Sequence, residues 1–349
     1  MFSVTEEQKQ QYHAFWNRQN TGRATLYLNS WDGSPAFAAP RDAEQKWGDM
    51  PYREQATVYQ MQHTRYHIDG FPSVFTNFGP GSLAACIGGN YHFAPDTVWF
   101  DNDRTEWDEI PAPELLENSE MYRMIEDMTQ RLLSHKDLLI TSISDIGGTF
   151  DIIASMRGTE NLLYDLYDQP DQIKAYCKKL QPVWRAYFER YSSRLLREQG
   201  AMTSWQPVWS DKTYYPLQCD FCAMLSPQMF DEFILPDLAY QMSYMDNAIY
   251  HLDGPGELPH VDSLLSLPRL SAIQWTSGDG NAPLTDPCWF PLYQKIIAAG
   301  KGLILLGPDV AGLENLFKHV SQKGMFISAG VRDEQEANEI ADMAKKLNF

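Results

Sequence analysis

The segment that decides the fold is Ala248–Gly254, AIYHLDG, in which a short apolar run ends in polar residues and a glycine. The run Ala248–Leu252 has the length and composition of a buried strand, and Gly254-Pro255-Gly256 ends it. A helical pattern comes later in the chain, as in parallel α/β folds. Residues that directly follow such strands converge on one face, where ligands bind. The segment therefore predicts both a strand and the position of a site.

Comparable apolar runs occur along the whole chain of 349 residues. With the first, they make about eight: Ala24–Asn29, Ser73–Phe78, Leu138–Ile143, Ala201–Trp209, Ala248–Leu252, Ala272–Trp275, Leu303–Gly307 and Met325–Ser328. Helical patterns lie between them, over 113–135, 160–198 with a break at Asp168-Gln169-Pro170, 226–246, 286–300, 310–323 and 333–347.

This alternation predicts an α/β fold, specifically a single (β/α)8 TIM barrel. A doubly wound sheet is the alternative, but neither GxGxxG nor GxxxxGK[ST] follows a predicted strand. We expect one domain over residues 1–349, with an N-terminal helix within 1–23. The aromatic and acidic stretch Pro80–Pro113 is expected to be an inserted lid.

Composition excludes several classes of function. Lys and Arg number 28 against 46 Asp and Glu, and the net charge of −18 opposes binding to nucleic acid or anionic membranes. No apolar run reaches the roughly 18 residues of a membrane span, and the first 19 residues do not resemble a signal peptide. The five cysteines suggest no disulfide framework. We therefore expect a cytoplasmic protein.

Polar and aromatic residues follow most of the predicted strands. The candidate substrate-binding residues are Asn29, Trp31, Asn77, Trp205, Trp209, Asp211, Tyr214, Gln274 and Trp275, and the candidate catalytic residues are Asp145, His251 and Asp253. An Asp beside a glycine can instead cap a helix or form a turn. Trp205 and Trp209 can equally be core residues or walls that stack on a flat ligand.

His251 and Asp253 form the sharpest pair. Strand alternation places residues i and i+2 on the same face, so both side chains are expected at the mouth. They suit a general acid/base pair or two ligands of a divalent metal; the alternative is a hydrogen-bonded His at a strand end. Cys219 and Cys222 form a C-x-x-C without the second Cys/His pair that a zinc site requires, which favours two thiols beside the pocket.

Two further segments resemble the uroporphyrinogen decarboxylase superfamily. Thr149–Pro170, TFDIIASMRGTENLLYDLYDQP, resembles its "RG…LL.DLYD.P" segment, and Leu225–Pro236, LSPQMFDEFILP, is similar to "MSPEMFREFVLP". His251-Leu252-Asp253-Gly254 stands where the corrinoid methyltransferase branch carries His-x-Cys-Gly. The resemblance extends from about Ala24 over nearly the whole chain. It implies a (β/α)8 barrel with one of two chemistries, metal-free decarboxylation of porphyrinogen acetates or zinc-dependent methyl transfer involving a corrinoid protein.

The chain departs from both branches. The decarboxylase branch has an arginine-containing run near the first strand, whereas LYLNSWDGSPAF at 26–37 contains no arginine. The zinc branch has cysteine where Asp253 stands and another near the last strand, whereas Ile327–Val331 contains none. His251 alone is unchanged, and a His/Asp set would be a harder ligand set than thiolates.

The leading hypothesis is an enzyme that demethylates a small methylated amine or ether and passes the methyl group to a corrinoid protein. A divalent metal such as zinc, held by His251 and Asp253, and a corrinoid carried by the partner are the cofactors it implies. The first alternative is a decarboxylase of another carboxylate, with Arg157 and Arg332 as its nearest cationic groups. The second is a non-catalytic binding protein. The expected partners are thus a small molecule and a corrinoid protein, with a homodimer left open.

Overall fold

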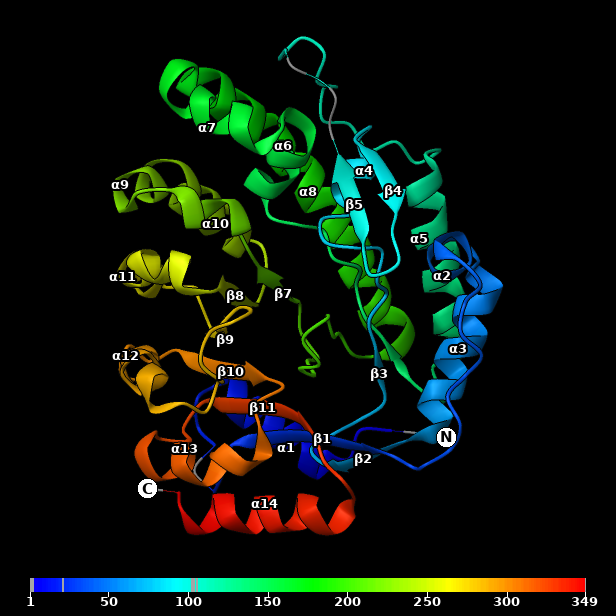
Figure 1. Cartoon of the computed structure of the whole chain (residues 1–349), viewed down its shortest axis with the longest axis vertical. Coiled ribbons are helices and arrows are strands. Elements are labelled where there is room, and N and C mark those ends of the chain that lie inside the picture. The colour runs from blue at the N-terminus through cyan, green and yellow to red at the C-terminus, as the bar shows by residue number, and fades with distance from the viewer. Residues whose placement is uncertain (1–2, 21, 102–103, 105, 349) are drawn as a thin grey trace.

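The computed structural model describes residues 3–20, 22–101, 104 and 106–348. In this part of the chain the largest sheet has seven strands in the order β2-β1-β11-β10-β9-β8-β7 (Figure 1). All neighbouring pairs are parallel except β1 with β2. The strands are β1 (Thr25–Trp31), β2 (Thr64–Ile68), β7 (Tyr214–Leu217), β8 (Asn247–Asp253), β9 (Ala272–Thr276), β10 (Gly302–Leu306) and β11 (Met325–Gly330).

Two smaller pairs complete the strands. β3 (Ser73–Val74) and β6 (Ile140–Thr141) pair in parallel. Just after β6, Ile143 N donates to the Thr203 carbonyl at 3.3 Å, which links this pair to the segment that precedes β7. β4 (Asn90–Phe93) and β5 (Val98–Asp101) form an antiparallel hairpin. The fold is therefore mixed α/β with a mostly parallel central sheet.

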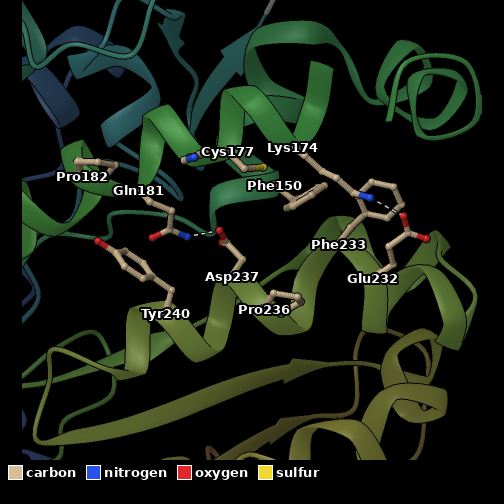
Figure 2. Close-up of a pocket in the computed structure, with 11 residues that line it drawn as sticks. Phe150, Lys174, Cys177, Gln181, Pro182, Glu232, Phe233, Pro236, Asp237 and Tyr240 are labelled. Carbon is tan, nitrogen blue, oxygen red and sulfur yellow. Dashed lines mark hydrogen bonds and ion pairs between the residues drawn. The ribbon is translucent and has the colours of Figure 1, made fainter. Parts of the chain in front are cut away.

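Helices line the outer side of the strands, and α9 to α14 follow one another along it in chain order (Figure 1). α8 packs beside α10 (Figure 2). The helices are α1 (Glu6–Trp16), α2 (Ala43–Gly48), α3 (Met50–His63), α4 (Leu83–Cys86), α5 (Glu120–Ser134), α6 (Thr149–Arg157), α7 (Thr159–Asp168), α8 (Pro170–Gln199), α9 (Pro227–Met229), α10 (Leu235–Met242), α11 (Val261–Ser266), α12 (Phe290–Ala298), α13 (Leu313–His319) and α14 (Glu334–Lys346).

Local sequence explains several helix boundaries. Pro170 begins α8, where its missing N–H costs no intrahelical bond, and this confirms the predicted break after Asp168. Ser226 Oγ accepts from Met229 N at 3.3 Å, which confirms the predicted cap of the helix that begins at Pro227. The helix predicted over 113–135 begins only at Glu120, where Ser119 Oγ accepts from Tyr122 N at 3.3 Å.

Seven of the eight predicted strand runs overlap an observed strand, and the run Ala201–Trp209 does not. Only an isolated antiparallel bridge joins Met202 and Ser210, because Ser204 and Gln206 bond to each other locally and Pro207 lacks an N–H. The strand lies later, at β7, and pairs in parallel with β8. The prediction was therefore wrong for this strand, because it placed the strand too early in the sequence.

The predicted insertion Pro80–Pro113 contains α4 and the β4–β5 hairpin. The turn of the hairpin is tied to α2, because Trp47 Nε1 donates to the Ala94 carbonyl at 2.7 Å. Residues 102, 103 and 105 of this stretch lie outside the described residues. Its role as a lid stays a prediction.

The N-terminal helix α1 covers the amino ends of several strands. Trp16 packs on Tyr214 at the start of β7, with ring centroids 5.1 Å apart, and its Nε1 donates to the Trp209 carbonyl at 3.0 Å. Tyr12 and Phe15 both contact Phe326 near the start of β11. The amino ends of these strands are thus closed by apolar packing, whereas their carboxyl ends are not covered by α1.

Candidate functional site

A cleft of about 400 Å³ lies beyond the carboxyl ends of β3, β6, β7 and β8. Its residues come from or follow the ends of these four strands, and others come from α2, from the turn of the β4–β5 hairpin and, with Trp205, from the irregular segment before β7. The lining residues are Trp47, Phe75, Asn77, Gly79, Pro80, Asp96, Thr97, Asp145, Trp205, Gln218, Asp220 and His251. A cleft of this size, with aromatic walls and a few converging polar groups, is typical of a small-molecule site.

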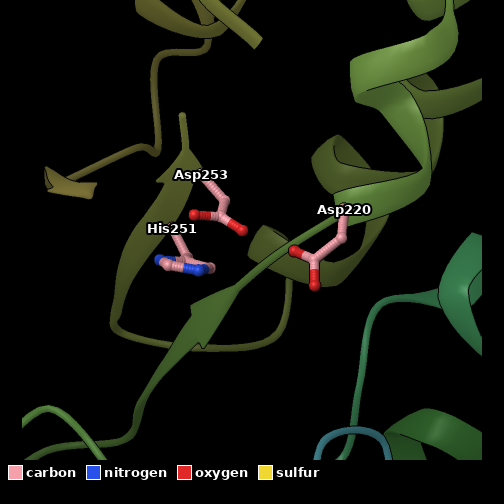
Figure 3. A group of neighbouring side chains, drawn as sticks. All are labelled: Asp220, His251 and Asp253. Carbon is pink, nitrogen blue, oxygen red and sulfur yellow. The ribbon is translucent and has the colours of Figure 1, made fainter. Parts of the chain in front are cut away.

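Asp220, His251 and Asp253 point toward one another at one side of the cleft (Figure 3). Each offers one ligand atom, and these atoms all lie within 4.8 Å of one another. β8 supplies two of the three because residues two apart on a strand share a face, as predicted. Asp220 follows the end of β7, the neighbouring strand.

A hydrogen bond to Gln274 orients the ring of His251. Its Nδ1 is hydrogen-bonded to Gln274 Oε1, and Gln274 Nε2 donates to Thr276 Oγ1 at 2.7 Å. Because the amide nitrogen of Gln274 already faces Thr276, its oxygen is the acceptor and His251 Nδ1 carries the proton. Nε2 of a neutral His251 then keeps its lone pair for a metal or a proton. The Trp205 ring fixes the imidazole edge-on, with centroids 5.0 Å apart and planes at 87°.

Asp145 is a buried carboxyl group at the cleft wall. Its Oδ1 accepts from the Tyr215 hydroxyl at 2.8 Å and from Gly147 N at 3.0 Å. Burial raises the pKa of Asp145 to about 6 although both hydrogen bonds lower it, and the Asp220 charge adds a smaller upward contribution. The carboxyl group therefore changes protonation close to neutral pH, in the range that suits a general acid or base.

Replacing Asp145 by asparagine is expected to stabilise the fold above pH 6. The pKa is raised on folding from 3.8 to about 6, so this carboxyl group favours the folded state below pH 4 and loses that contribution as the pH rises through 6. The loss amounts to about 3 kcal/mol at most. Asparagine keeps the Oδ1 acceptor without the charge.

Urea unfolding of both proteins at pH 4.5 and pH 8 measures this effect. The Asp145→Asn variant should gain stability over the native chain at pH 8 and much less at pH 4.5. If the stabilities of the two proteins differed equally at both pH values, the ionised Asp145 carboxylate would not destabilise the folded protein.

Asp220 is accessible because it stands between two hollows. The cleft and an adjoining hollow of about 400 Å³ share Pro80, Gln218 and Asp220 in their linings. Partial burial raises the pKa of Asp220, with His251 lowering it and Asp253 raising it. Asp151 lies behind Asp220, and its Oδ1 accepts from Phe221 N at 2.9 Å. Burial, and then the Asp220 charge, raises the pKa of Asp151. The site thus concentrates carboxyl groups.

Positive side chains do not balance these groups inside the cleft. Of the described residues that line it, three are Asp and none is Lys or Arg. Arg53, which lies behind the wall, donates to the Asn77 carbonyl and stacks over Phe78 at 4.2 Å. The cleft therefore favours a cation over an anion.

Five of the candidate residues from the sequence meet at this place. Asn77, Asp145, Trp205 and His251 line the cleft, and Asp253 joins His251. Gln274 is buried behind His251 as its hydrogen-bond partner, so it positions the ring instead of facing the cleft.

The other six candidates lie elsewhere, which corrects their predicted position at the mouth. Trp209 and Tyr214 are buried against α1 at the opposite end of the strands, and Asp211 pairs there with His13 at 3.0 Å. Misplacing the strand that is actually β7 caused these three errors.

Asn29, Trp31 and Trp275 belong to strands whose ends do not reach the cleft. Val331 N donates to the Asn29 carbonyl at 2.8 Å within the sheet. Trp31 is exposed and packs on Tyr59 of α3. Trp275 is fully buried against Trp289, because strand alternation sends it to the face opposite Gln274.

Six polar or aromatic residues of the cleft were missed: Trp47, Phe75, Asp96, Thr97, Gln218 and Asp220. Gln218 and Asp220 directly follow β7, so the strand-end rule would have found them had that strand been placed correctly. Cys219 and Cys222 beside them are buried free thiols, and Cys222 Sγ lies 3.5 Å from the Tyr250 hydroxyl. The interpretation of this C-x-x-C as two thiols beside the pocket agrees with that position.

Comparison with protein-family models gave no match, and neither did comparison with curated protein sequences. None of the helices within the described ranges is both long and apolar enough to cross a membrane.

Proposed function

We propose that this chain is a divergent member of the uroporphyrinogen decarboxylase superfamily that demethylates a small methylated amine or ether, with a corrinoid protein receiving the methyl group. The observation that carries the proposal is the combination of carboxylates and aromatic rings in a cleft whose described lining has no Lys or Arg. Such a lining suits an ammonium substrate.

We propose that the strands and helices of this chain form a closed (β/α)8 barrel. The parallel pairing of β1 with β11 supports it, because closure of a barrel brings the first and last strands together. The helices on the outer side of the strands agree with it (Figure 1).

The substrate's ammonium group would lie among the rings of Trp47, Phe75 and Trp205, which line the cleft together with Asp145 and Asp220. A cation over an aromatic face gains about 0.5–2 kcal/mol, more where water is excluded. The carboxylates add attraction that a neutral substrate of the same shape would not experience.

Demethylation of a quaternary ammonium needs no proton in the cleft. The C–N bond breaks, the leaving amine keeps its electron pair and departs neutral, and the methyl group leaves without that pair for the acceptor. An ether differs, because its leaving oxygen would carry a negative charge and needs a proton. Asp145, with its pKa near 6, is the group placed to donate one.

The residues Asp220, His251 and Asp253 fit a divalent metal such as zinc. Two carboxylates and one imidazole form a three-residue ligand set, and catalytic zinc sites have three protein ligands with a further position open. The hydrogen bond from His251 Nδ1 to Gln274 leaves Nε2 as the ligand atom. A metal bound there would act as a Lewis acid toward the oxygen of an ether substrate.

Decarboxylation is less well supported by the site. Arg157 is buried and paired with Asp165 at 2.7 Å, and Arg332 pairs with Glu336 at 2.8 Å on the surface. Neither lines the cleft. A carboxylate substrate would therefore meet acidic groups without a cationic partner.

A methyl-transfer assay tests the proposal. The protein is incubated with methylated amines and ethers and with cob(I)alamin, and mass spectrometry measures the demethylated product. We expect turnover of a methyl ether to fall by about 100-fold in His251→Asn, which loses a metal ligand, while His319→Asn on the outer helix α13 behaves like the native chain. Release of carbon dioxide from carboxylic acids, or ligand binding without any turnover, would support the decarboxylase or the non-catalytic alternative instead.

A further inference from the structure

A second groove lies outside the cleft, between α8 and the segment formed by α9 and α10 (Figure 2). It has a volume of about 550 Å³, within the range of sites that hold small organic ligands. Its walls are largely apolar, with Phe150 from α6, Pro182 from α8, and Phe233, Pro236 and Tyr240 from the opposite side.

Both helical walls depart from regular α-helix beside this groove. Pro182 stands inside α8, where it removes one backbone hydrogen bond and its ring strains the preceding turn. On the facing side, Phe230–Ile234 forms a π-helical turn, a feature frequently found at functional sites. An irregular helical turn thus lies in each of the two walls.

Two hydrogen-bond acceptors lie at the inner end of the groove. Gln181 Nε2 donates to Asp237 Oδ1, which fixes the orientation of the amide (Figure 2). Gln181 is only 7% exposed, and its Oε1 has no hydrogen-bond partner among the described residues. Figure 2 shows this oxygen turned away from Asp237 and toward Tyr240. A buried carbonyl without a donor costs about 1–3 kcal/mol, which a donor on a ligand would recover.

The groove is lined by two lysines, Lys174 and Lys178, and by two carboxylates, Glu232 and Asp237. At the outer end Lys174 Nζ pairs with Glu232 at 2.6 Å and lies 4.9 Å from the centre of the Phe233 ring, so this pair is neutral overall. At the inner end the Asp237 carboxylate has a neutral amide as its partner. The groove thus offers acceptors and negative charge at one end and apolar surface between the ends.

We propose that this groove binds a small organic amine whose ammonium group donates to Gln181 Oε1 and Asp237, with its apolar body against Phe150 and Phe233. The site is separate from the cleft at the strand ends, since the two share no lining residue. Its ligand is a primary or secondary amine with an aromatic or branched apolar body, because the groove supplies acceptors for more than one N–H.

Calorimetric titration with 2-phenylethylamine, and with 2-phenylethanol as a nearly isosteric neutral control, tests this site. We expect saturable binding of the amine and at least tenfold weaker binding of the alcohol. Asp237→Asn should weaken the amine at least tenfold. The titrations are repeated in the Asp220→Asn background, which removes a cleft carboxylate, and the difference between native Asp237 and Asp237→Asn should persist there, so failure here is distinguishable from failure of the proposed function.

Alkylation of Cys177 provides a second measurement that does not depend on a variant. Cys177 lines the groove, whereas Cys288 is exposed elsewhere and serves as the internal reference. Because burial raises the pKa of the Cys177 thiol and the thiolate is the reactive form, the reaction with iodoacetamide is followed until Cys177 of the ligand-free protein is modified. Peptide mass spectrometry should then show that 2-phenylethylamine slows modification of Cys177 and leaves Cys288 unaffected. Absence of saturable binding, equal binding by Asp237→Asn, loss of that difference in the Asp220→Asn background, or no protection of Cys177 would each overturn the proposal.

Discussion

Binding of a divalent metal is expected to fall by about 100-fold or more when Asp220 and Asp253 are both replaced by asparagine. The two carboxylates and His251 have ligand atoms within 4.8 Å of one another, and no other described group of three His, Cys, Asp or Glu is as close. Asparagine keeps the shape of the side chain but supplies a neutral oxygen, so both the charge and most of the attraction for the cation are lost.

Titration with Zn²⁺ and Mn²⁺ in a calorimeter measures this change. Asp231→Asn together with Asp262→Asn is the matched control, since both lie on the helical exterior and carry the same change in charge. The control should bind like the native chain. Equal affinity of the two double variants would show that the charge of the whole protein, and not this cluster, attracts the metal.

Replacing Gly148 by alanine is expected to destabilise the protein by about 3 kcal/mol, at the upper end of the cost of overpacking. The added Cβ would overlap the carbonyl oxygen of Gln218 and lie 2.5 Å from Asp151 Oδ2. Neither neighbour is free to move, because Gln218 leads directly from β7 to Asp220, and Asp151 Oδ1 holds Phe221 N. The backbone of Gly148 itself has an ordinary negative φ, so the cost is steric.

Gly330→Ala at the end of β11 is the control, because a Cβ there meets nothing within 4 Å. Chemical denaturation should place Gly330→Ala close to the native chain and Gly148→Ala well below it. A Gly148→Ala variant as stable as the native chain would mean that the approach of α6 to the segment after β7 is looser than described.

The sequence allowed much of the fold to be predicted, because apolar periodicity and glycine turns are local signals. β8 is the clearest case: alternation alone placed His251 and Asp253 on one face, and the structure brings them together. The antiparallel β2 was not foreseen, since Thr64–Ile68 is mostly polar and only partly buried.

The site was harder to predict than the fold. The run Ala201–Trp209 was taken as the strand although it contains Pro207, and the observed strand Tyr214–Leu217 was not foreseen, so Asp220 was overlooked. Trp47 and Asp96 reach the cleft from α2 and from the hairpin turn. No pattern at strand ends can identify such residues, because their position depends on packing between segments distant in sequence.

Comparison of a trimethylammonium compound with its tert-butyl isostere tests whether the cleft selects a methylated cation. The two differ in charge and hardly in shape, and the titration is done in the Asp237→Asn background so that the second groove does not contribute. We expect the cation to bind at least tenfold more tightly and Trp205→Ala to reduce this preference. Equal affinity for the two compounds, or tighter binding of the neutral one, would show that the cleft does not select a methylated cation.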